Sequence, residues 1–396
     1  MSRDDEIEHG RPKRVALGTI SKEWLRLGCI GFGGPATHIV LLRRLCVENR
    51  AWIDAKEFED GIATTNLLPG PASTQLALYC AWRLRGWVGA VVGGLCFIVP
   101  GLALILVLSA VFLASHPPVW VLGAAAGAGA AVPAVALNAA WRLVPVSWKR
   151  IGKNRAEKAR WVLYGLVGAA AAATVGPFLV LVLLACGMTE IIVRRVGRPP
   201  TARGSIRGFF PAVLLHGAAA GGLGALAWVA FKVGALSYGG GFVIVPLMQH
   251  DAVSAYHWMT GAQFLNAVAL GQVTPGPVVQ TVAVVGYAAG GIGGGLLAAL
   301  IAFAPSFAFV LAGGRHFDQI RANSTVESFL TGAGPAVIGS IAGSAIPLGL
   351  AFGHLWQIPV LAGAVLWLLA IRKGVVSGLL VAGAVGVAVA LAGAPA

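Results

Sequence analysis

Charged residues are scarce in this chain of 396 residues. Asp, Glu, Lys and Arg make up 11% of the sequence and hydrophobic residues 57%, whereas about 25% of a typical soluble protein is charged. Residues 87–114 carry no charged side chain, and a stretch of this length can cross a hydrocarbon core about 30 Å thick. The composition excludes a soluble enzyme, a disordered protein and a secreted disulfide scaffold. It predicts an all-α polytopic membrane protein.

Cysteine and histidine are too dispersed to indicate a metal centre or a disulfide framework. The five cysteines show no C-x-x-C spacing, and metal ligation needs clustered His, Cys or carboxylate groups. His38 and His216 are lone imidazoles, which we interpret as structural. The sequence therefore predicts no metal, no cofactor and no enzymatic centre.

The basic charge of the chain lies mostly in short loops. The net charge is 29 − 15 = +14, and short cytoplasmic loops of membrane proteins are rich in Lys and Arg. This charge therefore indicates membrane topology rather than a nucleic-acid partner. Residues 1–14 mix both signs of charge and lack the apolar region of a signal peptide. We expect a multi-pass protein of the inner (plasma) membrane with a cytoplasmic N-terminus.

The chain repeats itself at a spacing of 206 residues. The sequence FGGP at 32–35 recurs as YGGG at 238–241, and Pro-Gly-Pro at 69–71 recurs at 275–277. Phe97 recurs as Phe303, which predicts an ungapped register from Arg26 to Phe97. We therefore expect a tandem duplication with repeats over 1–193 and 209–396, joined by a basic cytoplasmic linker over 194–208.

Loop charges predict that the two repeats are inverted. Residues 43–57 contain four Lys or Arg residues, whereas the matching residues 249–263 contain none. By the positive-inside rule, equivalent loops then lie on opposite sides of the membrane, as in the inverted repeats of secondary transporters. An odd crossing must join the halves, and we expect it at residues 209–226.

Pro-Gly-Pro and Gly-Gly motifs predict broken or re-entrant helices in both repeats. Two prolines remove backbone donors and disfavour a continuous helix. Both flanks of 61–85 are basic, so this segment is expected to enter and leave on the cytoplasmic side. Full spans are expected at 87–114, 119–141, 291–314 and 328–346, and pairs of short helices at 161–193 and 356–394.

The four breaks predict a central cavity that binds an anion. Irregular backbone is tolerated at membrane depth where protein or a wet cavity satisfies it, and helix N-termini attract negative charge. The candidate binding residues are Gly33, Gly34, Asn66, Gly70, Ser73, Thr74, Gln75, Gly239, Gly240, Gln272, Thr274, Gly276, Gln280 and Thr281. The alternative is that their hydroxyls and amides only cap the helix breaks.

Two cations occupy equivalent positions before the first break of each repeat. Arg26 and Lys232 are 206 residues apart, and a cation within the membrane costs about 3 kcal/mol on insertion scales. Two symmetric cations could neutralise a doubly charged oxyanion. The alternative is snorkelling of both side chains to the membrane interface.

Three further charged residues are candidates for a gate or a proton relay: Asp60, Arg83 and Glu190. Asp60 could instead cap a helix, and Arg83 could instead set the topology. The sequence leaves the number of full spans and a homodimer open.

The motifs at the breaks make the chain resemble the chromate ion transporter family in its long, two-domain form. The resemblance rests on Phe32-Gly33-Gly34-Pro35, on Asn66 to Pro71, on Gly93-Gly94 through Pro100-Gly101, on Tyr238 to Gly241, on Ala269 to Pro277, and on Ala304-Pro305-Ser306. It covers nearly the whole chain. Many relatives carry an acidic or hydroxyl residue where Ala72 stands and Asp where Asn266 stands.

The resemblance implies export of chromate from the cytoplasm, driven by the proton-motive force, which would confer chromate resistance. Chromate is a tetrahedral dianion, which suits helix N-termini, hydroxyls and cations. Transport of sulfate or another oxyanion is the first alternative, because sulfate has the same charge and nearly the same shape. An enzyme acting on a lipid-linked phosphate and a membrane scaffold are further alternatives. Neither is favoured, since acid–base clusters are lacking and a scaffold explains no broken helices.

Overall fold

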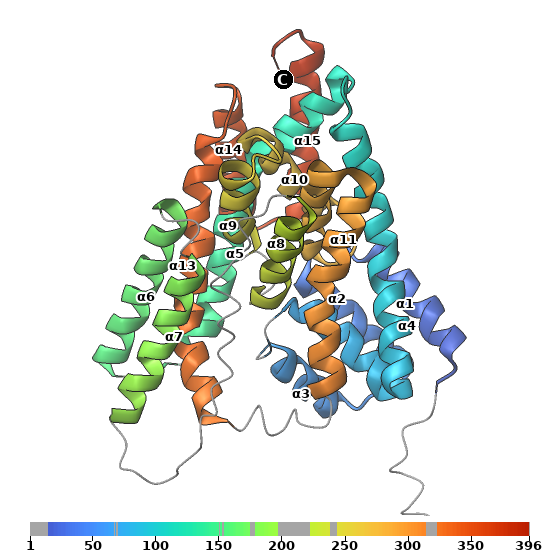
Figure 1. Ribbon diagram of the computed structural model, residues 1–396, viewed down its shortest axis with the longest axis vertical. Helices are drawn as coiled ribbons and strands as arrows, with labels where there is room; N and C mark the ends of the chain where they lie inside the picture. Colours follow the sequence, from blue (N-terminus) through green and yellow to red (C-terminus); the bar gives the residue numbers. More distant parts are fainter. Residues whose placement is uncertain are drawn as a thin grey trace, which may run out of the picture.

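The described part of the chain is helical, without strands, in the computed structural model (Figure 1). The structure describes residues 15–66, 68, 70–149, 151–152, 154–174, 179–196, 222–237, 244–313 and 323–395. The first half contains α1 (Leu17–Ile30), α2 (Pro35–Arg43), η2 (Arg44–Asn49), α3 (Ala55–Thr65), α4 (Ala72–Phe112), α5 (Val119–Trp148), α6 (Arg155–Thr174) and α7 (Leu179–Val196). The second half contains α8 (Leu223–Leu236), α9 (Ile244–Gln249), η5 (His250–Ala255), α10 (Gly261–Val273), η6 (Val278–Gln280), α11 (Thr281–Gly313), α13 (Ser324–Leu350), α14 (Gln357–Val365), η7 (Leu366–Ala370) and α15 (Val375–Leu391).

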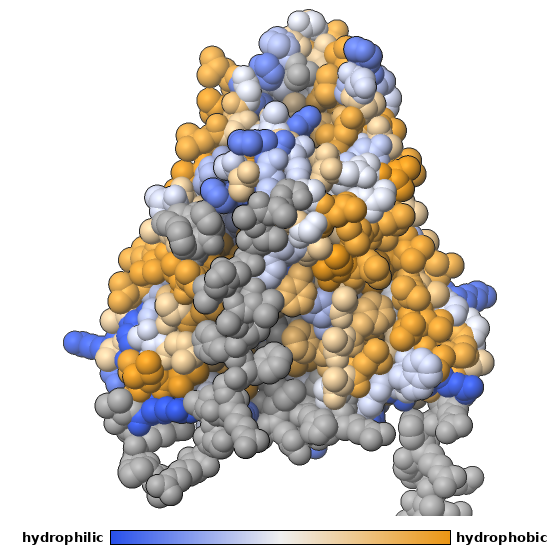
Figure 2. Space-filling model, in the orientation of Figure 1, coloured by the Kyte–Doolittle hydropathy of each residue, from blue (hydrophilic) through white to orange (hydrophobic). Residues whose placement is uncertain are grey.

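Among the described residues, four helices are long and apolar enough to cross a membrane. They are α4, α5, the continuous η6–α11 segment and α13. Figure 2 shows hydrophobic residues over both flanks of the molecule and hydrophilic residues gathered along its lower edge. This distribution confirms an all-α polytopic membrane protein.

The helices are interrupted at the predicted motifs. The chain leaves α1 at Gly31 and begins α2 at Pro35, and it leaves α3 at Asn66 and begins α4 at Ala72. In the second half, α10 ends before Thr274 and η6 begins after Pro277. The glycines at the centre of both Pro-Gly-Pro turns have a positive φ, +122° at Gly70 and +94° at Gly276, a conformation that favours glycine.

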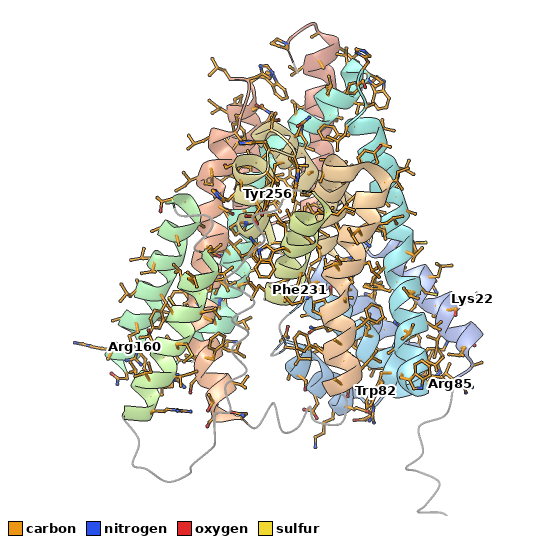
Figure 3. The ribbon with its side chains drawn as sticks, viewed as in Figure 1. Lys22, Trp82, Arg85, Arg160, Phe231 and Tyr256 are labelled. Atoms are coloured by element: carbon orange, nitrogen blue, oxygen red, sulfur yellow. The ribbon has the colours of Figure 1, made fainter. Side chains whose placement is uncertain are left out.

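The two halves point in opposite directions. Figure 1 shows α3 near the lower end of the molecule and its counterpart α10 near the upper end. Figure 3 places Trp82, Arg85 and Arg160 toward the lower end and Tyr256 toward the upper end. The labelled Arg85 and Arg160 of the first half thus lie toward the same end, as the positive-inside rule predicts for inverted repeats.

Each half packs its long middle helix against the terminal helix pair of the other half. α5 packs against α14 and α15, and α13 packs against α6 and α7. Small residues allow the close approach: a methyl group at Gly127 of α5 would lie 2.9 Å from Gly386 Cα. A methyl group at Gly343 of α13 would lie 2.7 Å from Ala169 Cα. Packing through small residues holds membrane helices together, and here it joins the repeats reciprocally.

The predicted ungapped register is wrong beyond the Pro-Gly-Pro turns. α4 bends at Gly86 (φ +65°) and α11 bends at Gly291 (φ +62°), and 291 − 86 = 205 rather than 206. Pro100 and Pro305, inside the same two helices, are also 205 apart. The second half replaces a first α-helical turn with the 3₁₀ turn η6. A 3₁₀ turn rises about 2.0 Å per residue instead of about 1.5 Å, so three residues gain the length of one α-helical residue.

Several predicted boundaries differ from the structure. The predicted span 87–114 is the second part of α4, and the span 119–141 extends to Trp148 as α5. Residues 223–226 of the predicted crossing belong to α8, the copy of α1 (17 + 206 = 223). The rest of that crossing, and the linker beyond Val196, lie outside the described residues. The repeat boundaries at 193 and 209 remain predictions.

Candidate functional site at the helix breaks

Backbone hydrogen bonds join each Pro-Gly-Pro turn to the first break of the other half. The Gly70 N–H donates to the Ser237 carbonyl oxygen at 3.0 Å, and the Gly276 N–H donates to the Gly31 carbonyl oxygen at 3.0 Å. Both pairs obey the repeat spacing, since 70 + 206 = 276 and 31 + 206 = 237. The breaks of the two halves therefore meet at one place, related by an approximate two-fold axis.

Three helix N-termini begin at these breaks without a side-chain cap. Their N-cap residues are Gly34 for α2, Pro71 for α4 and Pro277 for η6. By contrast, Asp54 caps α3 and Asn323 caps α13 through hydrogen bonds from their side chains. Uncapped N-termini leave N–H groups and a partial positive charge available to an anion.

Buried polar atoms without a hydrogen-bond partner gather around the same breaks. Their side chains are exposed by 4% or less. They are Thr74 Oγ1, Ser237 Oγ, Gln272 Nε2, Gln280 Oε1 and Ser306 Oγ. Leaving such a group unsatisfied costs about 1–3 kcal/mol. A group of five in one region indicates a place where water or a ligand supplies the missing hydrogen bonds.

Two glutamines lie against the turn glycines. A Cβ at Gly70 would lie 2.5 Å from Gln75 Nε2 and 3.1 Å from Ser306 Oγ, and a Cβ at Gly276 would lie 3.2 Å from Gln280 Nε2. Gln280 donates through Nε2 to the Ile98 carbonyl oxygen at 2.8 Å. Gln75 and Gln280 are 205 residues apart, as are the bends of α4 and α11. The glutamines are thus equivalent, which the register of 206 residues did not predict.

Most of the predicted break residues are brought together. Gly34 approaches Val278 of the other half, since a Cβ on this glycine would lie 3.5 Å from Val278 Cγ2. Ser73 is buried in the first turn of α4, and Asn66 is half-buried at the C-terminus of α3. Gly33 is exposed, and Gly239 and Gly240 lie outside the described residues.

Two of the predicted hydroxyls bond to their own helices instead of facing a ligand. Thr274 Oγ1 donates to the Leu270 carbonyl oxygen at 2.9 Å, and Thr281 Oγ1 donates to the Val278 carbonyl oxygen at 2.8 Å. These hydrogen bonds agree with the alternative that these two hydroxyls satisfy the helix breaks.

The predicted pair of cations facing the site is not found. The Arg26 side chain is 69% exposed, and its nearest carboxylate is Glu23 at 3.7 Å. The sequence made Arg26 and Lys232 equivalent by register alone, but helix α1 turns the Arg26 side chain outward.

Lys232 is buried, and its charge is already matched. Its ammonium group forms an ion pair with Asp251 of η5. The first half has a comparable ion pair with the charges exchanged. There the first helix, α1, carries the anion, and the buried Glu23 carboxylate accepts a hydrogen bond from Arg50 at 2.9 Å. Asp251 lies in the first turn of η5, and Arg50 directly follows η2, so each ion pair connects the first helix of a repeat to the region of its π-helical segment, which is a structural role.

Of the three candidates for a gate or a proton relay, two form ion pairs between neighbouring helices and the third lies within α3. Arg83 forms an ion pair with Glu57 and so ties α4 to α3. Glu190 accepts from Arg160 at 2.9 Å, from Arg194 at 2.9 Å and from Tyr164 at 3.2 Å, which ties α6 to α7. Asp60 lies within α3, and the N-cap of that helix is Asp54 rather than Asp60.

Ser237 and Ser306 were missed by the sequence reasoning. Ser237 directly precedes the YGGG motif, and Ser306 follows Pro305 as Gly101 follows Pro100. A Cβ at Gly101 would lie 2.5 Å from Gln280 Oε1. The serine therefore stands where the first half has no room for a side chain. The register of 205 residues would have revealed this substitution.

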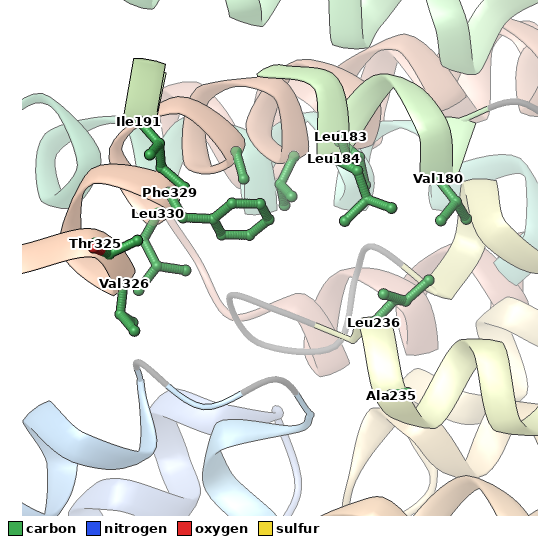
Figure 4. Close-up of a pocket in the computed structure, with 12 residues that line it drawn as sticks. Val180, Leu183, Leu184, Ile191, Ala235, Leu236, Thr325, Val326, Phe329 and Leu330 are labelled. Atoms are coloured by element: carbon green, nitrogen blue, oxygen red, sulfur yellow. The ribbon is translucent and has the colours of Figure 1, made fainter. Parts of the chain in front are cut away.

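Three cavities lined by described residues have walls that are almost wholly apolar. The cavity shown in Figure 4 has a volume of about 370 Å³ and lies between α7, the end of α8 and α13, with Val180, Leu236 and Phe329 in its wall. The other two have volumes of about 640 and 350 Å³. None of the three is lined by the polar residues with unsatisfied atoms. The predicted cavity between the breaks is not one of these three and remains a prediction.

Broken helices that meet head to head, in two oppositely oriented halves, define a multi-pass membrane protein with the architecture of inverted-repeat transporters. The chain belongs to the chromate transporter family, whose sequence model matches residues 18–191 and 224–390. No solved structure matches the chain.

Similar curated proteins carry chromate transport in their names. The chain is 32% identical over 333 residues to the chromate transport protein of Cupriavidus metallidurans, covering 82% of this chain and 80% of that protein. It is 29% identical over 357 residues to the chromate transport protein of Pseudomonas aeruginosa, with coverage of 87% and 84%. It is 28% identical over 357 residues to a probable chromate transport protein of Synechococcus elongatus, with coverage of 88% of each.

Proposed function

We propose that this protein exports chromate from the cytoplasm across the inner membrane and thereby confers chromate resistance. The observation that carries the proposal is the group of unsatisfied polar atoms between three uncapped helix N-termini. Family membership and the names of the relatives support chromate as the substrate.

The chemistry of the donors suits a tetrahedral dianion. The hydroxyls of Thr74, Ser237 and Ser306 and the amide nitrogen of Gln272 can each donate to an oxyanion oxygen. Gln280 Oε1 only accepts, so it suits a bound water or a protonated oxygen of the anion. The helix N-termini add partial positive charge without a charged side chain.

The membrane potential favours the proposed direction. A negative interior expels anions with about 2.3 kcal/mol per charge per 100 mV, so a dianion gains twice that amount. We propose that the proton-motive force, chiefly through its electrical part, drives the export. The basic first-half loops then face the cytoplasm, together with the N-terminus.

The proposal is tested by the accumulation of labelled chromate in cells with and without this protein. We expect less chromate in expressing cells, and we expect a protonophore to abolish the difference. Equal accumulation in both, with the protein correctly inserted, would contradict export.

Everted vesicles separate chromate from its closest competitor. We expect uptake of labelled chromate that increases when the vesicle interior is made positive. Sulfate has the same charge and shape, so its competition measures selectivity. Saturable sulfate uptake without chromate uptake would identify the protein as a sulfate transporter instead.

A further inference from the structure

His38 lies next to the junction between the two halves. It belongs to α2, is 1% exposed, and its Nε2 lies 2.9 Å from the Gly31 carbonyl oxygen. That oxygen also accepts the Gly276 N–H of the opposite Pro-Gly-Pro turn at 3.0 Å. One carbonyl therefore connects the imidazole of one half to the break of the other half.

The geometry fixes which nitrogen of His38 can titrate. A carbonyl oxygen only accepts, so Nε2 carries a hydrogen. Nδ1 is buried and has no hydrogen-bond partner. It is bare in the neutral imidazole and becomes a donor when the ring takes up a second proton. Phe97 packs edge-on against the ring at 5.0 Å between centroids and holds its orientation.

No charged side chain of the described residues hydrogen-bonds to His38, although the elements packed against it carry several. The exposed ones are Lys22 of α1, Arg44 of η2 and Arg85 of α4. The paired ones are Glu23 with Arg26 and Arg50, Arg43 with Glu48 and Glu59, and Arg83 with Glu57. The thiols on these elements are Cys29, Cys46, Cys80 and Cys96.

We propose that His38 couples proton uptake to oxyanion binding at the helix breaks. The proposal rests on the proposed function. A dianion arriving at the breaks supplies the negative charge that a buried imidazolium needs. A proton from solution then binds Nδ1, and the imidazolium in turn strengthens binding of the anion. This linkage is reciprocal, as for any two ligands of one protein.

The equivalent position in the second half is Ile244 (38 + 206), which cannot titrate. The coupling therefore involves one proton per chain and not two. His38 acts by positioning and charging the junction, since its Nε2 is held by Gly31.

The test compares labelled-chromate binding to the purified full-length protein and to His38→Gln between about pH 6 and pH 8. The glutamine amide nitrogen keeps a donor for the Gly31 carbonyl but does not titrate. Chromate itself takes up protons in this range, so the ratio of the two affinities is the quantity measured. The exposed His257, whose Nδ1 bonds to the Val253 carbonyl oxygen at 2.9 Å, gives the control variant His257→Gln.

We expect the affinity of the wild type relative to His38→Gln to rise as the pH falls, by at most about tenfold per pH unit for one linked proton. His257→Gln should follow the wild type. A constant ratio would contradict the coupling while leaving chromate transport intact. Absence of chromate binding to the wild type at every pH would contradict the proposed function and the coupling together.

A second measurement needs no variant. In weakly buffered solution, at a pH where free chromate is already the dianion and so releases no proton on binding, saturating chromate should cause the wild-type protein to take up as much as one proton. Proton release or no change on binding would overturn the proposal, even if His38→Gln failed to fold.

Discussion

Individual hydroxyl side chains at the breaks are of two kinds. Some bond to their own helix, and others have no hydrogen-bond partner and are available to a ligand. Thr274 and Thr281 complete their own helices, whereas Thr74, Ser237 and Ser306 keep buried hydroxyls without partners. A cap stabilises the fold when it is present, and an unsatisfied hydroxyl does not. Substitution of a helix-bonded hydroxyl should therefore lower stability, whereas substitution of an unsatisfied hydroxyl should lower transport.

Ser306→Ala removes an unsatisfied hydroxyl. We expect unchanged or slightly higher thermal stability and chromate transport lowered by about tenfold, the equivalent of one hydrogen bond of about 1.4 kcal/mol. Transport in proteoliposomes and thermal unfolding in detergent check the two effects. Ser344→Ala is the matched control, because this buried hydroxyl donates to the Ile341 carbonyl oxygen at 2.7 Å. A loss of stability without a loss of transport in Ser306→Ala would contradict its assignment.

Lys232→Met should destabilise the protein because it leaves Asp251 buried without its cation. Breaking a buried ion pair from one side costs about 3–5 kcal/mol, and we expect poor insertion or a much lower unfolding temperature. The double variant Lys232→Met with Asp251→Leu should recover both folding and transport. Arg26→Ala is the exposed control and should change neither. If the double variant folds but cannot transport chromate, Lys232 contributes to transport beyond its ion pair.

At the scale of the helical elements, the sequence motifs predicted where the helices break better than they predicted which side chains surround the breaks. Pro-Gly-Pro and the Gly-Gly motifs act locally, since two prolines around a positive-φ glycine, or paired glycines, disfavour a continuous helix at that point. The breaks were therefore predictable from the sequence. Which face of α1 carries Arg26, and which acid pairs with Lys232, depend on packing between distant segments. The 3₁₀ turn η6 also shifted the register by one residue, which hid the equivalence of Gln75 with Gln280 and of Gly101 with Ser306.

Gly70→Ala and Gly276→Ala test the turns themselves. Both glycines have a positive φ, a conformation that costs an L-residue about 1–2 kcal/mol. Their N–H groups also bond to the opposite half. We expect each variant to lose most of its transport activity in proteoliposomes with only this modest loss of stability. Gly224→Ala in α8 is the control, since a Cβ there meets no atom within 4 Å. Full activity in both turn variants would show that the junction is not part of the site.

At the scale of the whole molecule, the two oppositely oriented halves share one junction at the helix breaks. The reciprocal packing of α5 and α13 with the helix pairs of the opposite half makes the repeats inseparable. The cavity predicted between the breaks is absent from the three that the described residues line. Because the polar side chains with unsatisfied atoms at the breaks are buried, we expect an anion to reach them through a movement of one repeat against the other, as in alternating access.

Inverted topology predicts labelling from opposite sides. Asn49 and Ala255 are exposed and equivalent (49 + 206 = 255). In a cysteine-free background, Asn49→Cys should react with an impermeant thiol reagent only from the cytoplasm, and Ala255→Cys only from outside. Whole cells and everted vesicles supply the two orientations. Labelling of both positions from the same side would contradict the inversion.

The site itself is tested most directly by the anomalous scattering of chromium in crystals of the protein grown with chromate. Our account predicts one strong chromium peak at the junction of the breaks, within hydrogen-bonding reach of the hydroxyls of Thr74 and Ser306. A peak elsewhere, or none at the junction under saturating chromate, would contradict the assignment of this site.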